Sequence, residues 1–208
     1  MSEAIERLDK AMVLALARTT MRQESEAILA LAEGLDDSFW ICAQLISACQ
    51  GLVWVTGAGT SAAVAQRFAH ILNCCGTRSM FLHPSDSLHG HAGVLAEEDM
   101  LIAMSRGGES SEVNALVDIA NQRNLTTVAF VHNTDSTLAR ACKYVLPIRS
   151  KQEHELKGYI ATTSTVAFSA MCDALSTVVW EAKGYTLKEF SKTHPGGAVG
   201  KVFCSGVD

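Results

Sequence analysis

Five short apolar runs alternate with helix-like segments in the chain after Gly51, and this alternation restricts the fold more than any other feature. The runs occupy 52–56, 79–82, 100–104, 126–131 and 144–148. Helix-like segments follow them at 61–74, 110–122, 135–142 and 163–183. Repeated strand–helix units favour a parallel sheet, because each right-handed crossover returns the chain to the same edge. We therefore predict an α/β fold with a doubly wound, five-stranded parallel sheet.

The first 50 residues differ, because their apolar residues recur at helical spacing. One long helix or two consecutive helices are expected over 4–35, and a further helix begins at Asp36 or Asp37. The predicted organisation is one domain, 1–208, with a helical arm (1–50) and an α/β core (51–208). Such an arm either packs against a partner subunit or covers one face of the sheet.

Charge and cysteine content exclude several classes of function. The net charge is -5 and no long run of Lys or Arg occurs, so a positive stripe for a nucleic-acid backbone is lacking. The 7 cysteines show no C-x-x-C pair and no metal-ligand spacing, which predicts reduced and mostly buried thiols. No secretory signal pattern is present, and no apolar run reaches the ~20 residues that span a bilayer. We expect a cytoplasmic protein without nucleic-acid or membrane partners.

Three loops rich in Gly, Ser and Thr follow predicted strands and enter helices. Helix N-termini attract anions, and the carboxyl ends of parallel strands meet at one edge of a sheet. One such cluster is more often only a helix cap, but three at equivalent positions predict a phosphate site. The residues expected to hold phosphate are Gly59, Thr60, Ser61, Ser105, Ser110, Ser111, Thr163 and Ser164.

Two nucleotide-binding patterns do not match the sequence. A dinucleotide fold requires an acidic residue at the end of the second strand, about 20 residues after the first Gly loop. The sequence at that place is Leu82-His83-Pro84. A P-loop requires Gly-Lys followed by Ser or Thr, which the first loop lacks. A small phosphorylated metabolite is therefore the expected ligand.

Acid–base residues lie beside these loops, as proton transfer next to a carbonyl requires. Glu112 is in the first turn after the second loop and Glu109 precedes it by three residues, although either could serve only the helix dipole. Histidines 83, 89 and 91 follow the second strand, and Glu153, His154 and Glu155 follow the fifth. The last group could also form a weak metal site. We nevertheless expect neither a metal nor a cofactor.

Together these segments resemble the sugar isomerase (SIS) domain over about residues 35–202. In chain order they are Gly57-Ala58-Gly59-Thr60-Ser61, His83-Pro84 with His89-Gly90, Ser105 to Glu112, the hydroxyls of 162–165, and His194-Pro195-Gly196-Gly197-Ala198-Val199-Gly200. The last segment is similar to that of the arabinose-5-phosphate isomerases. The resemblance implies a flavodoxin-like core, a homotetramer and sites built between subunits.

The resemblance also implies catalytic roles for Glu112, Glu153 and His194, and we assign His89 an assisting role. Glu155 is an alternative to Glu153, because we align the segment 153–161 as one residue longer than in the family. Thr60 replaces a family lysine, which removes a cation near the phosphate or the reacting carbonyl. The CBS modules that usually follow the last segment are missing from the sequence, so we expect a bare SIS domain.

These observations predict an aldose–ketose isomerase of sugar phosphates, with arabinose 5-phosphate and ribulose 5-phosphate as the leading pair. One alternative is a non-catalytic phosphosugar sensor, in which Thr60 marks lost chemistry. Another is an isomerase of a hexose or amino-sugar phosphate, which would differ only in the depth of its pocket.

Overall fold

A parallel sheet of five strands in the order β2-β1-β3-β4-β5 forms the centre of the computed structural model, which describes residues 9–197 and 200. Its strands are β1 (Val53–Gly57), β2 (Ser79–Phe81), β3 (Met100–Met104), β4 (Thr126–Val131) and β5 (Tyr144–Pro147). The register pairs Gly57 with Met104, so β1 and β3 end side by side. The predicted doubly wound sheet is confirmed.

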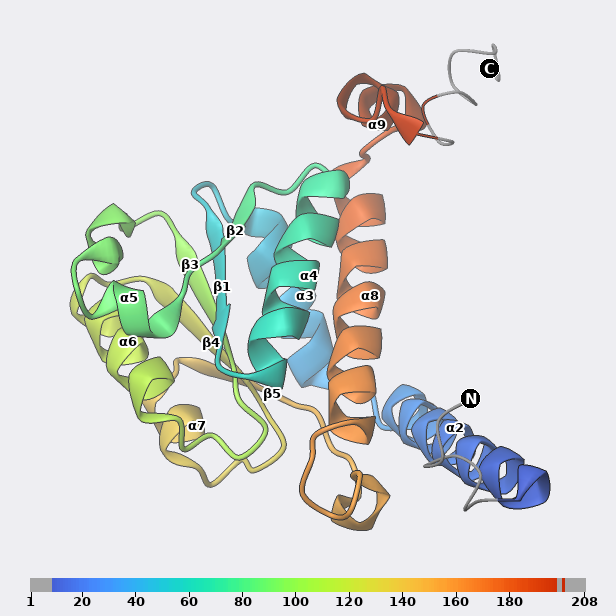
Figure 1. Ribbon diagram of the computed structural model, residues 1–208. Helices are drawn as coiled ribbons and strands as arrows, with labels where there is room; N and C mark the ends of the chain where they lie inside the picture. The colour runs from blue at the N-terminus through green and yellow to red at the C-terminus, as the bar shows by residue number, and fades with distance from the viewer. Residues whose placement is uncertain (1–8, 198–199, 201–208) are drawn as a thin grey trace.

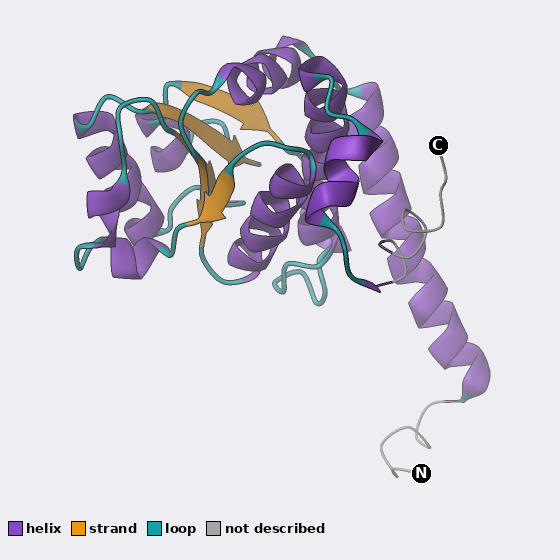
Figure 2. Cartoon of the chain, turned by 90° about the horizontal axis from the view of Figure 1, so that it is seen from above, coloured by secondary structure: helices purple, strands orange, loops and turns teal. Residues whose placement is uncertain are grey.

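Helices cover both faces of the sheet, as Figures 1 and 2 show. One face carries α3 (Asp37–Ala48), α4 (Thr60–Cys74) and α8 (Thr163–Lys183), and the other carries α5 (Pro84–Ser87), α6 (Ser111–Gln122) and α7 (Thr137–Ala141). Successive strand residues point to opposite faces, so Ile102 packs with the first layer and Leu101 with the second. Both are fully buried, and burial of such a side chain contributes about 1.5–3 kcal/mol. Two layers of buried apolar side chains therefore hold the strand ends in place.

The segment expected to be helical at 4–35 forms one continuous helix, α2 (Lys10–Glu33), and its residues 4–8 lie outside the described part of the chain. Asp9 caps α2 by accepting the Met12 amide at 2.8 Å. Figures 1 and 2 show α2 projecting away from the sheet layers. Ala27 is its one buried residue, whereas Leu16, Met21 and Leu29 are each more than half exposed. Most of α2 therefore covers no sheet face, whereas α3, in the same arm, does.

No helix among residues 9–197 combines the length and apolar character needed to cross a membrane. The six cysteines that the structure describes are free thiols, and Cys204 lies outside the described residues. Four of the six are buried. Burial raises the pKa of Cys42 and of Cys142 to about 12, so both thiols stay protonated at neutral pH.

Short elements were missed because too few residues repeat to produce a periodic pattern. They are α5, the 3₁₀ turns η1 (His91–Val94) and η2 (Gln152–His154), and α9 (Leu187–Thr193). The start of α9 does carry a readable signal, since Thr186 and Glu189 form a capping box. This helix matters for the site, because His194 follows it directly.

Candidate functional site

The sheet has a topological switch point between β1 and β3. The chain leaves β1 into α4 on one face and leaves β3 into α6 on the other face. A crevice opens between two such loops at the carboxyl ends of the strands, where α/β proteins bind their ligands. The first and second predicted phosphate loops are therefore neighbours in space.

The N-terminus of α4 has no side-chain cap. Its N-cap is Gly59, whose φ of 57° lies in the left-handed region that favours glycine. A Cβ atom there would meet nothing within 4 Å, so conformation rather than space selects glycine. Thr60 is exposed and Ser61 half-buried at the first positions of the helix. The first amides of α4 are thus left without an intramolecular side-chain acceptor.

The N-terminus of α6 is similar, because the hydroxyl of its N-cap Ser110 makes no capping hydrogen bond. Its Oγ lies 3.4 Å from Oγ of Ser105, a buried residue that accepts the Gly108 amide at 3.1 Å. Ser111 is exposed and its hydroxyl donates to Glu112 at 3.3 Å. Other helices do have side-chain caps, supplied by Asp9, Asp36, Ser136 and Thr186. Uncapped amides at α4 and α6 are what an anion site requires.

The N-terminus of α8 is filled by the protein itself. The Glu155 carboxylate accepts the amides of Thr162 at 2.6 Å and Ser164 at 3.0 Å, and the residue is 4% exposed. The turn at Lys157 and Gly158, both with left-handed φ, brings Glu155 back onto this helix. Thr163 donates its hydroxyl to the His154 carbonyl at 2.8 Å. Unlike the first two clusters, this predicted phosphate cluster is buried and engaged internally.

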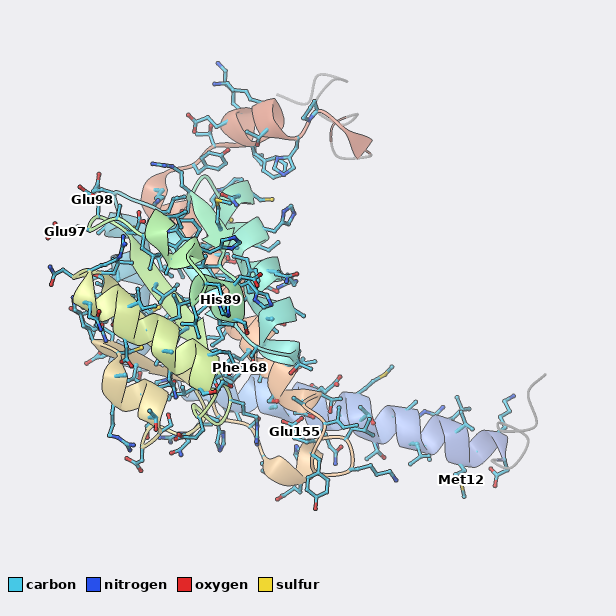
Figure 3. The ribbon with its side chains drawn as sticks, turned by 60° about the vertical axis from the view of Figure 1, so that its left-hand side comes forward. Met12, His89, Glu97, Glu98, Glu155 and Phe168 are labelled. Atoms are coloured by element: carbon cyan, nitrogen blue, oxygen red, sulfur yellow. The ribbon has the colours of Figure 1, made fainter. Side chains whose placement is uncertain are left out.

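A small cavity of about 40 Å³ joins α4, the β3–α6 loop and α8. Of its described lining residues, only Arg106 carries a charge. The Arg106 Nε atom lies 3.4 Å from Oε1 of Glu155, and Figure 3 labels Glu155. Sequence reasoning missed Arg106, although a cation within the second Gly-rich loop was a visible signal. The cavity is lined by Thr60, Ser61, Val64, Arg106, Ala161, Ser164, Thr165 and Phe168.

The two candidate carboxylates of the second loop have different surroundings. Glu109 accepts hydrogen bonds from the Thr137 amide at 2.9 Å and the Thr137 hydroxyl at 2.7 Å, which lower its pKa. It therefore ties the loop to the start of α7. Glu112 is half-buried in the first turn of α6, beside the uncapped amides. Of the two, Glu112 is placed to reach a ligand in the crevice.

Glu153 and His89 are exposed residues of loops that follow strands. Glu153 lies in η2, and His89 lies between α5 and η1 (Figure 3). His83 serves α5, since its Nδ1 accepts the Asp86 amide at 3.4 Å. The described residues include no group of three or more His, Cys, Asp or Glu side chains suited to a metal ion.

His194 lies at the far end of the molecule from these loops. It stacks on Phe190 with ring centroids 3.7 Å apart, and its Nε2 lies 3.3 Å from the Cys74 sulfur. Cys74 ends α4 whereas Ser61 begins it, and a rise of 1.5 Å per residue separates them by about 20 Å. Figure 1 shows α9 beyond the opposite end of α8 from the strand-end loops. Within one chain, the structure does not bring His194 to Glu112.

A larger cavity, of about 390 Å³, lies away from the switch point, between α2 and the chain that follows β5. Arg149 and Lys151 contribute positive charge to its lining, Glu26 contributes negative charge, and Ala27 and Ala30 form its apolar wall. None of the predicted phosphate-binding residues lines it. Volume alone therefore does not identify the site.

Comparison with known proteins identifies the family of this arrangement. A family model described as the SIS domain matches residues 47–178. Arabinose 5-phosphate isomerase KdsD from Shigella flexneri is 33% identical over 178 residues, which are 86% of this chain and 54% of that protein. A probable arabinose 5-phosphate isomerase from Haemophilus influenzae is 34% identical over 188 residues, or 90% of this chain and 56% of that protein. The chain spans about half the length of these relatives.

Solved structures agree with the fold. A sugar-phosphate isomerase described as putative, from Listeria monocytogenes, has a TM-score of 0.88 at 33% identity, covering 91% of this chain and 100% of its own. An Escherichia coli CFT073 protein in complex with arabinose 5-phosphate has a TM-score of 0.87 at 26% identity, covering 90% of this chain and 100% of its own.

Proposed function

Because the chain belongs to the SIS domain family, we propose that it binds a sugar phosphate in the β1/β3 crevice and isomerises it between aldose and ketose forms. The observation that carries this proposal is the pair of uncapped helix N-termini, α4 and α6, beside the carboxylate of Glu112. The similarity to arabinose 5-phosphate isomerases favours arabinose 5-phosphate and ribulose 5-phosphate as the pair.

The phosphate is held by the amides that open α4 and α6 and by the hydroxyls beside them. A phosphate offers acceptors in several directions, and hydrogen bonds to its charge are roughly twice as strong as neutral ones. Ser61 serves from α4, and Ser105, Ser110 and Ser111 serve from the second loop. Gly59 lets the backbone approach the anion, and Thr60 adds an exposed hydroxyl.

Glu112 acts as the general base in this proposal. It removes the proton from C2 of the open-chain aldose, and the electron pair forms the C1–C2 double bond of an enediolate while O1 becomes negative. The same carboxyl then returns the proton to C1, while the proton of the C2 hydroxyl passes to O1 and the C2 carbonyl forms. Amide and hydroxyl donors stabilise the charge in between.

His194 serves the crevice of another copy of the chain. The separation of about 20 Å from Ser61, set by the length of α4, prevents the two from meeting within one subunit. The exposed apolar residues of α2 supply a surface for such association. We therefore propose a homo-oligomer, a tetramer by analogy with the family. The free thiols favour the reducing cytoplasm as its location.

Solvent-deuterium exchange tests this function. The purified protein is incubated in deuterated water with arabinose 5-phosphate, ribulose 5-phosphate, and a panel of hexose and amino-sugar phosphates. Deuterium at C1 or C2 of the pentose phosphates is the expected result. Exchange only with a hexose or amino-sugar phosphate would mean that the substrate is the larger sugar. Tight binding without exchange in any sugar would mean that the protein is a phosphosugar sensor and not an enzyme.

A further inference from the structure

Among the described residues that line the small cavity at the crevice, Arg106 is the one that carries a charge. It borders the cavity that Thr60 and Ser61 also line, next to the uncapped start of α4. Its side chain is 25% exposed, so the surrounding protein restricts its position while a ligand can still reach it. Because the cavity of about 40 Å³ accommodates little more than one water, a ligand must lie at its mouth, within reach of this side chain.

Glu155 fixes Arg106 without cancelling its charge. The carboxylate already accepts two amides of α8, and Oε1, the acceptor of the Ser164 amide, also lies 3.4 Å from the guanidinium. The neighbouring His132 reports the local field: its amide donates to the Arg106 carbonyl at 3.0 Å. Burial lowers the pKa of His132 first, and the charges of Arg106 and Arg149 lower it further against the smaller opposing effect of Glu155. At His132, the charges of Arg106 and Arg149 therefore outweigh that of Glu155.

We propose that Arg106 is the cation that binds the phosphate of the sugar, and that Glu155 is a positioning residue for its guanidinium. The proposal rests on the proposed function of the crevice. A phosphate dianion needs positive charge as well as neutral donors, and the planar guanidinium fork fits phosphate oxygens two at a time. Arg106 supplies both at the mouth of a cavity whose other described lining residues are uncharged.

The variant Arg106→Gln is suited to the test because it should fold. Without the guanidinium, Glu155 still accepts two amide hydrogen bonds and still faces the positive end of α8. The negative charge of the buried carboxylate therefore remains compensated. The dissociation constant of arabinose 5-phosphate is measured by calorimetry, with inorganic phosphate as a competing probe and kcat recorded in parallel. We expect the Kd of both ligands to rise at least tenfold, because weaker binding raises Kd, and kcat to fall far less. Arg106→Lys should recover part of the loss.

Arg67→Gln is the matched control, because Arg67 also pairs with a carboxylate, Asp173, but on the exposed side of α4 and α8. It removes the same charge and should leave Kd within twofold. Unchanged Kd in Arg106→Gln, or a fall in kcat alone, overturns the proposal while the proposed function stands. If the wild type binds no sugar phosphate in the panel, both proposals fall together.

A double-mutant cycle tests the positioning role of Glu155. If Glu155 acts through Arg106, then Glu155→Gln weakens the Kd of arabinose 5-phosphate, and the Arg106→Gln, Glu155→Gln pair weakens it no more than Arg106→Gln alone. Additive losses in Kd would mean that Glu155 supports the site independently of Arg106 and would overturn this role. Stability measured in the same variants is a separate readout, because loss of the α8 cap lowers it in either case.

Discussion

The N-terminus of α8 and those of α4 and α6 look alike in sequence, yet the structure uses them differently. All three follow strands and carry Ser or Thr clusters. At α8 the buried carboxylate of Glu155 occupies the amides, whereas no side chain caps α4 or α6. The amides of a helix N-terminus can bind a ligand only when no side chain of the protein already accepts their hydrogen bonds. The Glu155 carboxylate therefore gives α8 a structural role and leaves ligand binding to α4 and α6.

The largest expected effect separates the two carboxylates of this comparison, since Glu112 borders the open end of α6 and Glu155 is committed to α8. Glu112→Gln removes the proposed base and should reduce kcat by roughly 10²–10⁴-fold with little change in sugar-phosphate affinity. Steady-state turnover and calorimetry measure the two quantities. Asp118→Asn, an exposed change on the same helix, is the control. Full turnover in Glu112→Gln would assign the proton transfer to another group.

The next effect concerns the two ends of α4, with Ser61 at one end and His194 packed against Cys74 at the other. His194→Gln should lower kcat by up to the same 10²–10⁴-fold range. If His194 serves another copy, Glu112→Gln and His194→Gln subunits that are mixed, unfolded and refolded together should regain turnover. Some sites then combine an intact Glu112 from one chain with an intact His194 from another. Mixtures that remain as inactive as each variant alone would place both residues in the same chain's site.

A smaller effect tests which hydroxyls belong to the ligand. Replacing Ser61 and Ser110 with Ala should weaken sugar-phosphate binding about tenfold or more for each residue, because charge-assisted hydrogen bonds contribute about 1.5–3 kcal/mol. Thr163→Val, by contrast, removes the buried bond to the His154 carbonyl and should cost about 1–3 kcal/mol of unfolding free energy with unchanged affinity. Denaturation curves and calorimetry would detect a reversal of this pattern, which would make α8 the ligand-binding end.

Sequence periodicity was sufficient for the scaffold and insufficient for this division of the helix ends. The bounds of β3, β4 and α8 were predicted to the residue, because long apolar runs and strong helical spacing mark them. The engagement of Ser164 depends on a turn at Lys157 and Gly158 that folds Glu155 back over nine residues. No local pattern encodes that return.

The position of His194 was also beyond sequence reasoning, although its motif was visible. The motif begins directly after α9, but the length of α8 carries it to the opposite end of the sheet from the loops. Proximity in a list of motifs is therefore not proximity in the fold. Arg106 illustrates the converse, because its role depends on neighbours from α4 and α8 that are distant in the sequence.

The smallest expected effect is a shift in the pKa of His132, which tests the charge beside the N-terminus of α8 in the absence of ligand. His132 accepts the Ser150 amide on Nδ1 at 3.1 Å, which requires that nitrogen to be unprotonated. Burial and the charges of Arg106 and Arg149 lower its pKa. The unfolded chain therefore takes up a proton first as pH falls below about 6.5, so this group's stabilisation is complete above that pH and is lost as pH falls through the lowered folded value.

Arg106→Gln removes one repelling charge and should raise the pKa of His132 in an NMR titration, whereas Arg67→Gln should leave it unchanged. An unshifted His132 in Arg106→Gln would mean that Glu155 already neutralises the guanidinium, and the contrast between an occupied α8 and a positive crevice beside it would have to be abandoned.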